Sequence, residues 1–326
     1  MIKKASIIIP CYNTAENIGR TLQAFIEQTQ PAKAYEIIVI DDCSTDQTVA
    51  EIRKKVEAPQ LIFLQNEQNS GPAHTRNRGI DQASGEIIIF SDGDTVPGMG
   101  YVEKHLETHI RYSEPYFVVS GAAAMPEDIE ITPLMYLGNV VQTMGAAEYV
   151  EDDPYDWLHF STLNVSLKSE FLADSRFDEG SFVRKTDSET ELAGFEDTEL
   201  AQRLAKKGMK LVYNPNILAY HYHFRSPEDY LNKVHEYGKR FRVWISLCPP
   251  EEASELQLRM NYLLDRKSIL SSRNLWECFR RLLVNDLSFP AIKRAAKFFE
   301  NRNERLSLFL YQKVYKYLFL KGYFSK

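Results

Sequence analysis

The sequence predicts an α/β protein whose mixed, mostly parallel sheet is flanked by helices and followed by an all-helical C-terminal extension. Three observations support this fold class. Short apolar runs alternate with segments of helical periodicity over the first hundred residues. The interiors of these runs are almost continuously apolar, as in parallel strands that are covered on both faces. Beyond Ser226 only helical patterns remain. We therefore expect two domains, residues 1–225 and residues 226–326.

The alternation can be followed element by element. The first strand is expected in "ASIIIPCYN", and a helix follows in "TAENIGRTLQAFIEQT", where Ile18, Leu22 and Phe25 have helical spacing. The later strands are expected in "YEIIVIDDCSTD", "LIFLQN" and "EIIIF", and the helices between them in "QTVAEIRKKV" and "GPAHTRNRGIDQA". In such a sheet, ligands bind beyond the carboxyl ends of the strands, where the polar residues of these segments fall.

The middle of the chain continues with less regular elements. Strands are expected in "YFVVSGAAAM" and "HFSTLNVSL", and a helix that ends at Gly208 is expected in "GFEDTELAQRLAKKG". The stretch "MKLVYNPNILAYHYH" predicts two short strands around Asn214 and Pro215. No internal repeat or low-complexity segment interrupts this order.

Composition narrows the class of protein. The 326 residues are 44% hydrophobic and 26% charged, which is typical of a globular protein. Four scattered cysteines without CxxC spacing argue against a zinc site or a disulfide framework and favour a reducing compartment. The net charge of −6 combines a basic tail with an acidic body, since residues 273–326 hold 12 Lys and Arg against 4 Asp and Glu. An acidic body argues against a nucleic-acid partner.

Two carboxylates follow the strand "EIIIF" with one residue between them. Asp92 and Asp94 flank Gly93 at the expected ligand-binding edge of the sheet. Paired carboxylate oxygens suit a hard divalent cation such as Mg²⁺ or Mn²⁺, and the glycine permits a sharp turn. An isolated Asp-Gly-Asp is more often an ordinary surface turn. Its position directly after a buried strand favours the metal site here.

Other charged residues lie at the same edge. Asp41 and Asp42 close the second strand, where a carboxylate can accept hydrogen bonds from a base or a ribose, or simply cap a turn. Arg76 is suited to a diphosphate or to an acidic cluster, although a solvated helix arginine is an equally good interpretation on its own.

Two further sets of residues stand later in the chain. Glu196 and Asp197 open a helix, which the helix dipole favours without any function, but a carboxylate here is also suited to act as a general base. His221 and His223 alternate along an expected strand and would point to the same face. Either histidine is a candidate to complete a metal site with Asp94.

Taken together, these segments resemble the family 2 glycosyltransferases of the GT-A fold, which are inverting enzymes that use nucleotide-sugar donors. The resemblance covers roughly residues 5–245, and it rests on the order and spacing of five stretches rather than on any one of them. They are "SIIIPCYNTAENIGRTLQAFIEQT", "YEIIVIDDCSTDQT", "NSGPAHTRNRGIDQASGEIIIFSDGD", "STLNVSL" with "RFDE", and "GFEDTELAQRLAKKGMKLVYNPNILAYHYH".

The resemblance implies a donor-binding role for one set of residues. Pro10, Tyr12 and Glu16 match the first loop, which contacts the nucleoside in the family. Asp42, with Asp41 beside it, matches the acid that reads the uracil or ribose. Arg76 matches a basic residue near the donor. Asp92, Gly93 and Asp94 match the DxD motif.

It implies the catalytic and metal-binding roles for a second set. Asp197 matches the catalytic base of an ED pair, with Glu196 supporting the acceptor. Asp94 matches the aspartate that binds the metal, and His221, or alternatively His223, matches a histidine that helps to bind it. Many members extend the DxD motif with a third acid, where this chain has Thr95.

The resemblance thus implies a metal-dependent transferase, with Mn²⁺ or Mg²⁺, that moves a sugar from a nucleotide sugar, for which UDP is the commonest nucleotide in the family, to a glycan, a glycolipid or another surface polymer. Two alternatives remain. A nucleotidyltransferase that acts on sugar phosphates would need a basic, glycine-rich first loop, and "PCYNTAEN" has no basic residue. An inactive sugar-binding relative would not need to keep Asp94 and Asp197.

The acceptor side and the tail are less specific. Aromatic residues that are suited to stack on sugar rings, but that occur more often in protein cores, are Tyr136, Tyr149, Tyr155 and Trp157. Asn164 is a further candidate for acceptor binding. The apolar and basic tail fits packing against the catalytic domain, a peripheral contact with the inner face of the cell membrane, or a dimer contact. The expected location is the cytoplasm, since no apolar run is long enough to span a bilayer.

Overall fold

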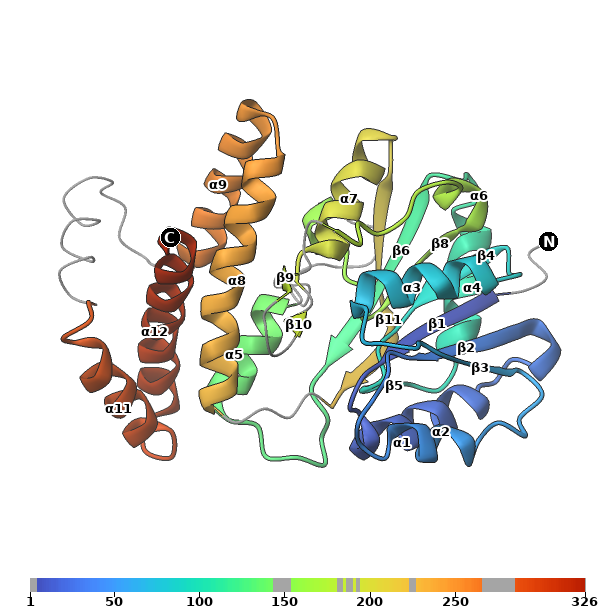
Figure 1. Ribbon diagram of the computed structural model, residues 1–326, viewed down its shortest axis with the longest axis horizontal. Coiled ribbons are helices and arrows are strands. Elements are labelled where there is room, and N and C mark those ends of the chain that lie inside the picture. The colour runs from blue at the N-terminus through green and yellow to red at the C-terminus, as the bar shows by residue number, and fades with distance from the viewer. Residues whose placement is uncertain are drawn as a thin grey trace. The chain divides into compact units, whose positions relative to one another are not determined.

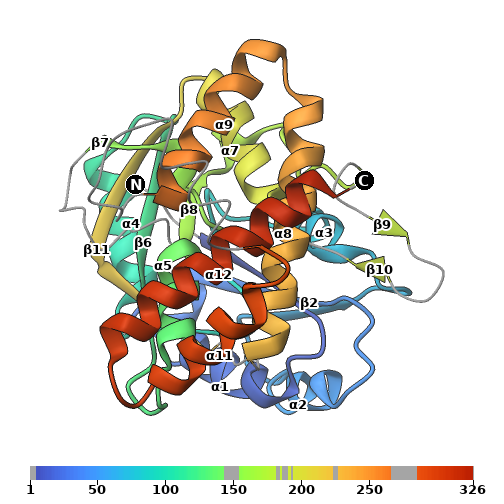
Figure 2. The same cartoon turned by 90° about the vertical axis from the view of Figure 1, so that its left-hand side faces the viewer.

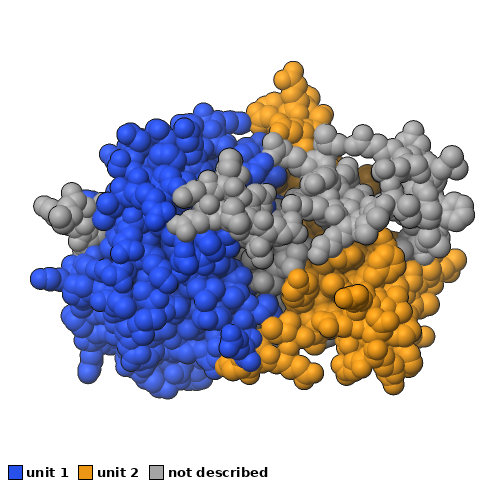
Figure 3. Space-filling model, turned by 180° about the vertical axis from the view of Figure 1, so that it is seen from behind, with its two compact units in different colours: residues 1–127, 145–223 blue, residues 128–144, 224–326 orange. Residues whose placement is uncertain are grey.

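The computed structural model describes residues 5–142, 154–180, 184–185, 190–191, 194–222, 227–265 and 285–325. These residues form two compact units, which are coloured separately in Figure 3. The first comprises residues 1–127 and 145–223, and the second comprises residues 128–144 and 224–326. Helix α5 (Pro133–Gln142) therefore groups with the C-terminal helices, although its sequence position lies inside the expected first domain.

The first unit contains a mixed sheet with the strand order β3-β2-β1-β4-β8-β6-β11-β5, and β7 pairs with β11. The strands are β1 (Ala5–Cys11), β2 (Tyr35–Asp41), β3 (Leu61–Gln65), β4 (Ile87–Phe90), β5 (Thr95–Pro97), β6 (Phe117–Ala124), β7 (Pro154–Tyr155), β8 (Val165–Lys168) and β11 (Lys210–His221). Strands β1 to β4 pair in parallel, whereas β8 runs antiparallel between β4 and β6. The predicted fold class, a mostly parallel sheet flanked by helices, is confirmed.

Helices cover both faces of this sheet. They are α1 (Ala15–Ile26), α2 (Thr48–Arg53), α3 (Gly71–Gln82), α4 (Tyr101–Arg111), α6 (Ser169–Leu172) and α7 (Glu196–Lys206), with short 3₁₀ turns η1 (Ala32–Ala34) and η3 (Trp157–His159). In Figure 1, α1 and α2 lie on one side of the sheet and α3 lies on the other. A small separate hairpin pairs β9 (Arg184–Lys185) with β10 (Thr190–Glu191).

Alternate strand residues supply two hydrophobic layers, as the continuous apolar runs predict. Ile7 and Ile9 of β1 face the layer that contains α1, where Leu22 and Phe25 are fully buried. Ile8 of β1 faces the opposite layer, which is built with α3 and α7. Helices cover both sides of each central strand. Packing on both sides holds the strand ends, and with them the start of each following loop, in defined positions.

One element differs from its prediction. The segment that was expected to form two short strands around Asn214 and Pro215 is the single strand β11, which pairs with β6 along its length. Its register against β6 shifts between Asn214 and Leu218. This irregularity accommodates the proline, which lacks the N–H group that a regular ladder would use, so the strand continues instead of ending.

The second unit is helical. Its helices besides α5 are α8 (Pro227–Leu247), α9 (Pro250–Asp265), α11 (Phe289–Phe299) and α12 (Glu304–Phe324). Figures 1 and 2 both show α12 beside α8 and α11. Among the described residues, no helix combines the length and the hydropathy that a membrane span requires.

Two glycines set the packing of α8 against α12. A Cβ atom built on Gly238 would overlap the backbone oxygen of Phe319, and one built on Gly322 would overlap the backbone oxygen of His235. The two helix backbones therefore touch directly, and Phe241 packs its ring against Phe319 beside the crossing. Only a residue without a side chain fits at either position.

Candidate active site

The centre of the candidate site is a buried ion-pair cluster around Arg76 in α3. Its Nη1 donates to Glu196 Oε1 at 2.9 Å, and its Nη2 donates to Asp92 Oδ1 at 2.8 Å. These residues come from the helix after β3, the first turn of α7 and the loop after β4. The structure therefore brings three predicted site residues together, and it assigns Arg76 to the acidic cluster, the second of the two roles suggested by its sequence.

The arginine sets the charge of its neighbours. Burial alone would raise the pKa of Glu196, but the charge of Arg76 and a hydrogen bond from Gly194 N hold it below its ordinary value. Burial raises the pKa of Asp92, and the charge of Asp94 adds to this effect while Arg76 opposes it. Glu196 therefore remains an ionised carboxylate that is paired with Arg76.

Asp197 has a different environment. It is half-buried beside Glu196, and its Oδ1 accepts hydrogen bonds from Thr198 N at 2.7 Å and from Thr198 Oγ1 at 3.1 Å. Withdrawal from solvent, followed by the negative charge of Glu196, raises its pKa to about 6. A carboxylate with this pKa is a far better proton acceptor at neutral pH than an ordinary aspartate.

Asp94 and His221 form a second pair, on neighbouring antiparallel strand ends. Asp94 precedes β5, His221 ends β11, and His221 Nε2 lies 3.5 Å from Asp94 Oδ1. The backbone reinforces this approach, because Tyr222 N donates to Asp94 O at 2.8 Å. Helix α1 holds the same segment, since Asn17 Nδ2 donates to Tyr222 O. His223 lies outside the described residues.

Gly93 packs closely against neighbouring atoms. Its φ angle is not among the positive values of the chain, so the turn after β4 does not need a left-handed residue. A Cβ atom at this position would come within 3.0 Å of Cys11 Cβ and within 3.2 Å of Thr14 Oγ1. The loop with the two aspartates therefore lies directly against the loop that follows β1.

The loops after β1 and β2 are joined to each other. Pro10 is buried within β1, whereas Tyr12 and Glu16 are exposed on the loop and on the first turn of α1. Asn13, with a φ of 51°, accepts a hydrogen bond from Thr45 N at 2.8 Å through its side chain. The first loop that the sequence predicted thus meets the loop after Asp42.

The two acids at the end of β2 play different structural roles. The carboxylate of Asp42 accepts hydrogen bonds from Gly71 N at 2.7 Å, from Ser70 N at 2.9 Å and from Asn66 Nδ2 at 2.6 Å, so it caps the start of α3. Asp41 Oδ2 accepts from Ser44 N, whereas Asp41 Oδ1 is buried without a hydrogen-bond partner in the described part of the chain. An unsatisfied buried carboxylate oxygen is costly and indicates a missing donor.

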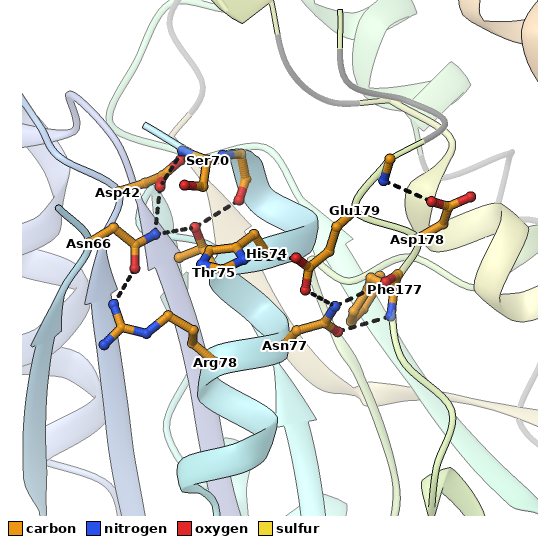
Figure 4. Close-up of polar contacts among 12 residues, drawn as sticks. Asp42, Asn66, Ser70, His74, Thr75, Asn77, Arg78, Phe177, Asp178 and Glu179 are labelled. Atoms are coloured by element: carbon orange, nitrogen blue, oxygen red, sulfur yellow. Dashed lines mark hydrogen bonds and ion pairs between the residues drawn. The ribbon is translucent and has the colours of Figure 1, made fainter. Parts of the chain in front are cut away.

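Figure 4 shows a network along α3 that the sequence did not identify. Asn77 Nδ2 donates to Phe177 O at 2.9 Å and to Glu179 Oε1 at 2.6 Å, and Phe177 N donates back to Asn77 Oδ1. His74 Nδ1 lies 2.8 Å from Glu179 Oε2. The network ties residues 177–179 to the helix that carries Arg76. The partners are about a hundred residues apart, and only the match of "RFDE" to the family pointed to this segment.

The candidate acceptor residues are dispersed. Asn164 is buried, and its Nδ2 donates to Ala122 O and to Ile217 O, while its Oδ1 lies 3.1 Å from His105 Nε2. Its amide thus joins β6, β11 and α4. Trp157 packs partly buried against the hydrophobic layer of α7. Tyr155 lies in β7, Tyr136 is exposed on α5 in the other unit, and Tyr149 lies outside the described residues.

Comparisons with known proteins show which family and fold this chain resembles. The family profile described as Glycosyl transferase family 2 matches residues 6–162. The amylovoran biosynthesis glycosyltransferase AmsB of Erwinia amylovora is 28% identical over 82% of this chain and 87% of its own length. The poly(ribitol-phosphate) beta-N-acetylglucosaminyltransferase TarS of Staphylococcus aureus is 40% identical over 28% of this chain. That match spans only 16% of TarS.

Solved structures share the fold. The mannosyltransferase PcManGT of Pyrobaculum calidifontis, in complex with GDP-Man and Mn²⁺, aligns with a TM-score of 0.63 at 18% identity, covering 100% of this chain and 88% of its own. TarS residues 1–349, in complex with UDP-GlcNAc, align with a TM-score of 0.54 at 18% identity, covering 98% and 89%. At this level of identity the alignments establish the fold alone.

Proposed function

Because the chain belongs to glycosyl transferase family 2, we propose that it transfers a sugar from a nucleotide diphosphate sugar to a hydroxyl group of a glycan, a glycolipid or another surface polymer. The observation that carries the proposal is the placement of Asp197. Its pKa of about 6 suits it to accept a proton, and it adjoins Glu196, which the charge of Arg76 keeps ionised. When the environments of two adjacent carboxylates shift their pKa values in opposite directions, the two groups commonly have different roles in acid–base catalysis.

The proposed reaction is a single displacement. The acceptor hydroxyl loses its proton to Asp197 as its oxygen bonds to the anomeric carbon of the donor sugar. The bond between that carbon and the phosphate oxygen breaks at the same time, and the nucleoside diphosphate leaves with the electron pair. Because attack and departure occur on opposite faces, the anomeric centre inverts. A positioned base of this kind contributes about 10²–10⁴-fold to the rate.

Asp94 and His221 fit a divalent cation. A carboxylate oxygen and an imidazole nitrogen, 3.5 Å apart, offer ligands that Mn²⁺ accepts, and two protein ligands are typical of sites where phosphates supply the rest. Among the described residues there is no group of three or more His, Cys, Asp or Glu side chains suited to a metal. When bound, the cation would neutralise charge that develops on the diphosphate. Asp92, which is paired with Arg76, is left to approach the ribose or the sugar.

We propose that Asp41 accepts a hydrogen bond from the nucleoside of the donor. Asp41 Oδ1 lacks a partner in the described part of the chain, whereas the Asp42 carboxylate is already occupied by three donors. Asp41 is fully buried, so an N–H group of a bound base would reach its Oδ1 only after the surrounding loops move. The TarS structure contains UDP-GlcNAc and the PcManGT structure contains GDP-Man, so a UDP-sugar and a GDP-sugar are the donors to compare. We place the reaction in the cytoplasm, because four scattered cysteines without CxxC spacing favour a reducing compartment.

Thermal stabilisation by a panel of nucleotide sugars with Mn²⁺ tests the proposal. A specific donor raises the melting temperature, since a ligand that binds only the folded state stabilises it. The matched control is Asp41→Asn, which should reduce the shift for the preferred nucleotide. A shift with nucleoside triphosphate and sugar phosphate, but with no nucleotide sugar, would instead establish a nucleotidyltransferase.

A further inference from the structure

One face of α12 in the second unit carries basic and apolar residues. The residues that α12 buries define its inner face, and they are Ser307, Tyr311, Val314, Tyr315, Phe319 and Gly322. The opposite face follows the same helical spacing, and it consists of Arg305, Phe309, Lys313, Lys316, Leu320 and Phe324, which we call the outer stripe. Phe309 is 51% exposed and Phe324 is 67% exposed. Arg305 is exposed like these two rings, whereas Lys313, Lys316 and Leu320 in the middle of the stripe are half-buried.

The charge of the outer stripe has one sign. Its three charged residues are Arg305, Lys313 and Lys316, and it contains no Asp or Glu. The described stretch 285–325 contains eight Lys and Arg against three acids. Two of these acids are already engaged inside the unit, because Asp286 pairs with Lys321 and Glu300 accepts a hydrogen bond from Tyr311. The surface therefore attracts anions.

Cations and aromatic rings are combined on this surface. The Lys313 ammonium lies 4.8 Å from the ring centroid of Phe309, and the Arg302 guanidinium lies 4.1 Å from that of Phe298, which is 55% exposed on α11. Long basic side chains that lie over exposed rings are suited to a boundary where the ring enters an apolar layer and the charge stays among anionic headgroups.

The inner face of α12 already has its partners. Ser307 Oγ donates to Ala296 O of α11 at 2.8 Å, and Phe319 packs against Phe241 of α8. The outer stripe is thus not the packing surface of the helix. A two-fold contact with a second copy would place the same patch on both sides of the interface. Arg305, Lys313 and Lys316 would then face the same three cations of the second copy, which argues against a dimer through this stripe.

We propose that the outer stripe of α12 binds the surface of an anionic lipid bilayer, with Phe309 and Phe324 at the acyl boundary and the basic residues at the headgroups. The contact is peripheral, and its strength depends on the negative surface charge of the membrane. It would hold the protein at the surface where a lipid-linked acceptor is found, but it does not depend on the identity of the donor or the acceptor.

Sedimentation of the full chain with vesicles tests this proposal. Vesicles of phosphatidylglycerol and phosphatidylcholine in equal parts are compared with vesicles of phosphatidylcholine alone. We expect binding to the anionic vesicles that weakens with added salt. The double variant Arg305→Glu/Lys316→Glu should lower the partition coefficient by at least about tenfold, given the contribution of each basic residue near such a surface.

Matched controls separate the stripe from net charge. Lys33→Glu/Arg53→Glu makes the same change in net charge at exposed positions of the first unit and should leave vesicle binding unchanged. Phe309→Ser/Phe324→Ser removes the apolar component alone and should also weaken binding. Equal binding to neutral vesicles, equal loss in the control, or a dimer in sedimentation velocity that the stripe variant abolishes would each overturn the proposal. These measurements need no donor, so they leave the proposed reaction to its own test.

Discussion

The guanidinium of Arg76 reaches Glu196, 120 residues away in the sequence, through a hydrogen bond of 2.9 Å between two almost fully buried side chains. The bond joins α3 to the first turn of α7, which carries the proposed base Asp197. Arg76 also bonds Asp92, so one cation balances carboxylates from two different loops. The arrangement of charge around this arginine leads to the first predictions.

Replacement of Asp197 by asparagine should abolish transfer while donor binding is retained. The amide keeps the oxygen that accepts from Thr198 N but cannot take a proton from the acceptor. We expect turnover to fall about 10²–10⁴-fold, with an unchanged thermal shift by the donor. Glu199→Gln, at another acid in the first turn of α7, is the control and should retain activity. Turnover of Asp197→Asn within about tenfold of wild type would contradict the assignment of the base.

The rate should depend on pH through the same group. Asp197 must be deprotonated to act as a base, and its pKa is about 6. The rate of transfer under limiting substrate should therefore fall as the pH drops below about 6, with an acid limb that reports this group. A rate that stays level down to pH 4.5 would show that the general base is a carboxyl group with an ordinary pKa.

The same substitution should stabilise the fold at neutral pH. The raised pKa means that folded Asp197 binds its proton more tightly than the unfolded chain does, so wild-type stability is lost as pH rises from about 4 through about 6. Asp197→Asn avoids this loss. Its gain in free energy of unfolding should reach at most about 3 kcal/mol above pH 7 and vanish near pH 4. Chemical denaturation at the two pH values measures the difference.

Removal of Arg76 should destabilise the protein more than the loss of a surface arginine. Arg76→Met leaves the buried carboxylate of Glu196 without its cation, and breaking such a pair costs about 3–5 kcal/mol. The exposed Arg53→Met is the control, with little change expected. Arg76→Met/Glu196→Gln should recover part of the loss, because the unpaired charge is gone. A double variant as unstable as the sum of both single variants would mean that the two residues act independently.

Removal of divalent cations should abolish transfer and weaken donor binding together. Excess EDTA should eliminate turnover, and Asp94→Asn should reduce the Mn²⁺-dependent part of the thermal shift by the donor. Asp81→Asn, at an exposed acid paired with Arg176, is the matched control and should behave as wild type. Full activity in EDTA would exclude a metal role for Asp94 and His221.

The glycine crossing of α8 and α12 gives a prediction for the second unit. Gly238→Ala adds a Cβ atom where the Phe319 oxygen already lies, and such overpacking costs about 1–3 kcal/mol. Gly19→Ala in α1, where the nearest atom would be a side-chain oxygen at 3.6 Å, should be neutral or stabilising because alanine favours helices. Thermal unfolding compares the two variants. A Gly238→Ala protein as stable as Gly19→Ala would show that the helices do not touch.

The sequence predicted the first half of the sheet well, because each strand and helix there is specified by its own periodicity. The antiparallel insertion of β8 between β4 and β6 follows from contacts between residues about 80 apart, such as Ile87 and Lys168, which no local pattern specifies. The grouping of α5 with the C-terminal helices was not predicted for the same reason.

The candidate site shows the same division. Carboxylates at strand ends could be located from the sequence, since parallel strands end at one edge. Their partners could not, as the bonds of Asn77 to Phe177 illustrate. Asn164 also appeared suited to an acceptor, but its amide holds three elements of the core together. Whether a polar side chain serves the ligand or the fold depends on neighbours that only the folded chain provides.

The direct backbone contact at Gly238 and Gly322 has a consequence for how the second unit can diverge. Mutations at the crossing are constrained by the lack of any space, whereas the outward positions of α12 contribute little to the fit between the helices. Substitutions at the outward positions should therefore disturb the packing of α8 against α12 far less than any side chain placed at Gly238 or Gly322.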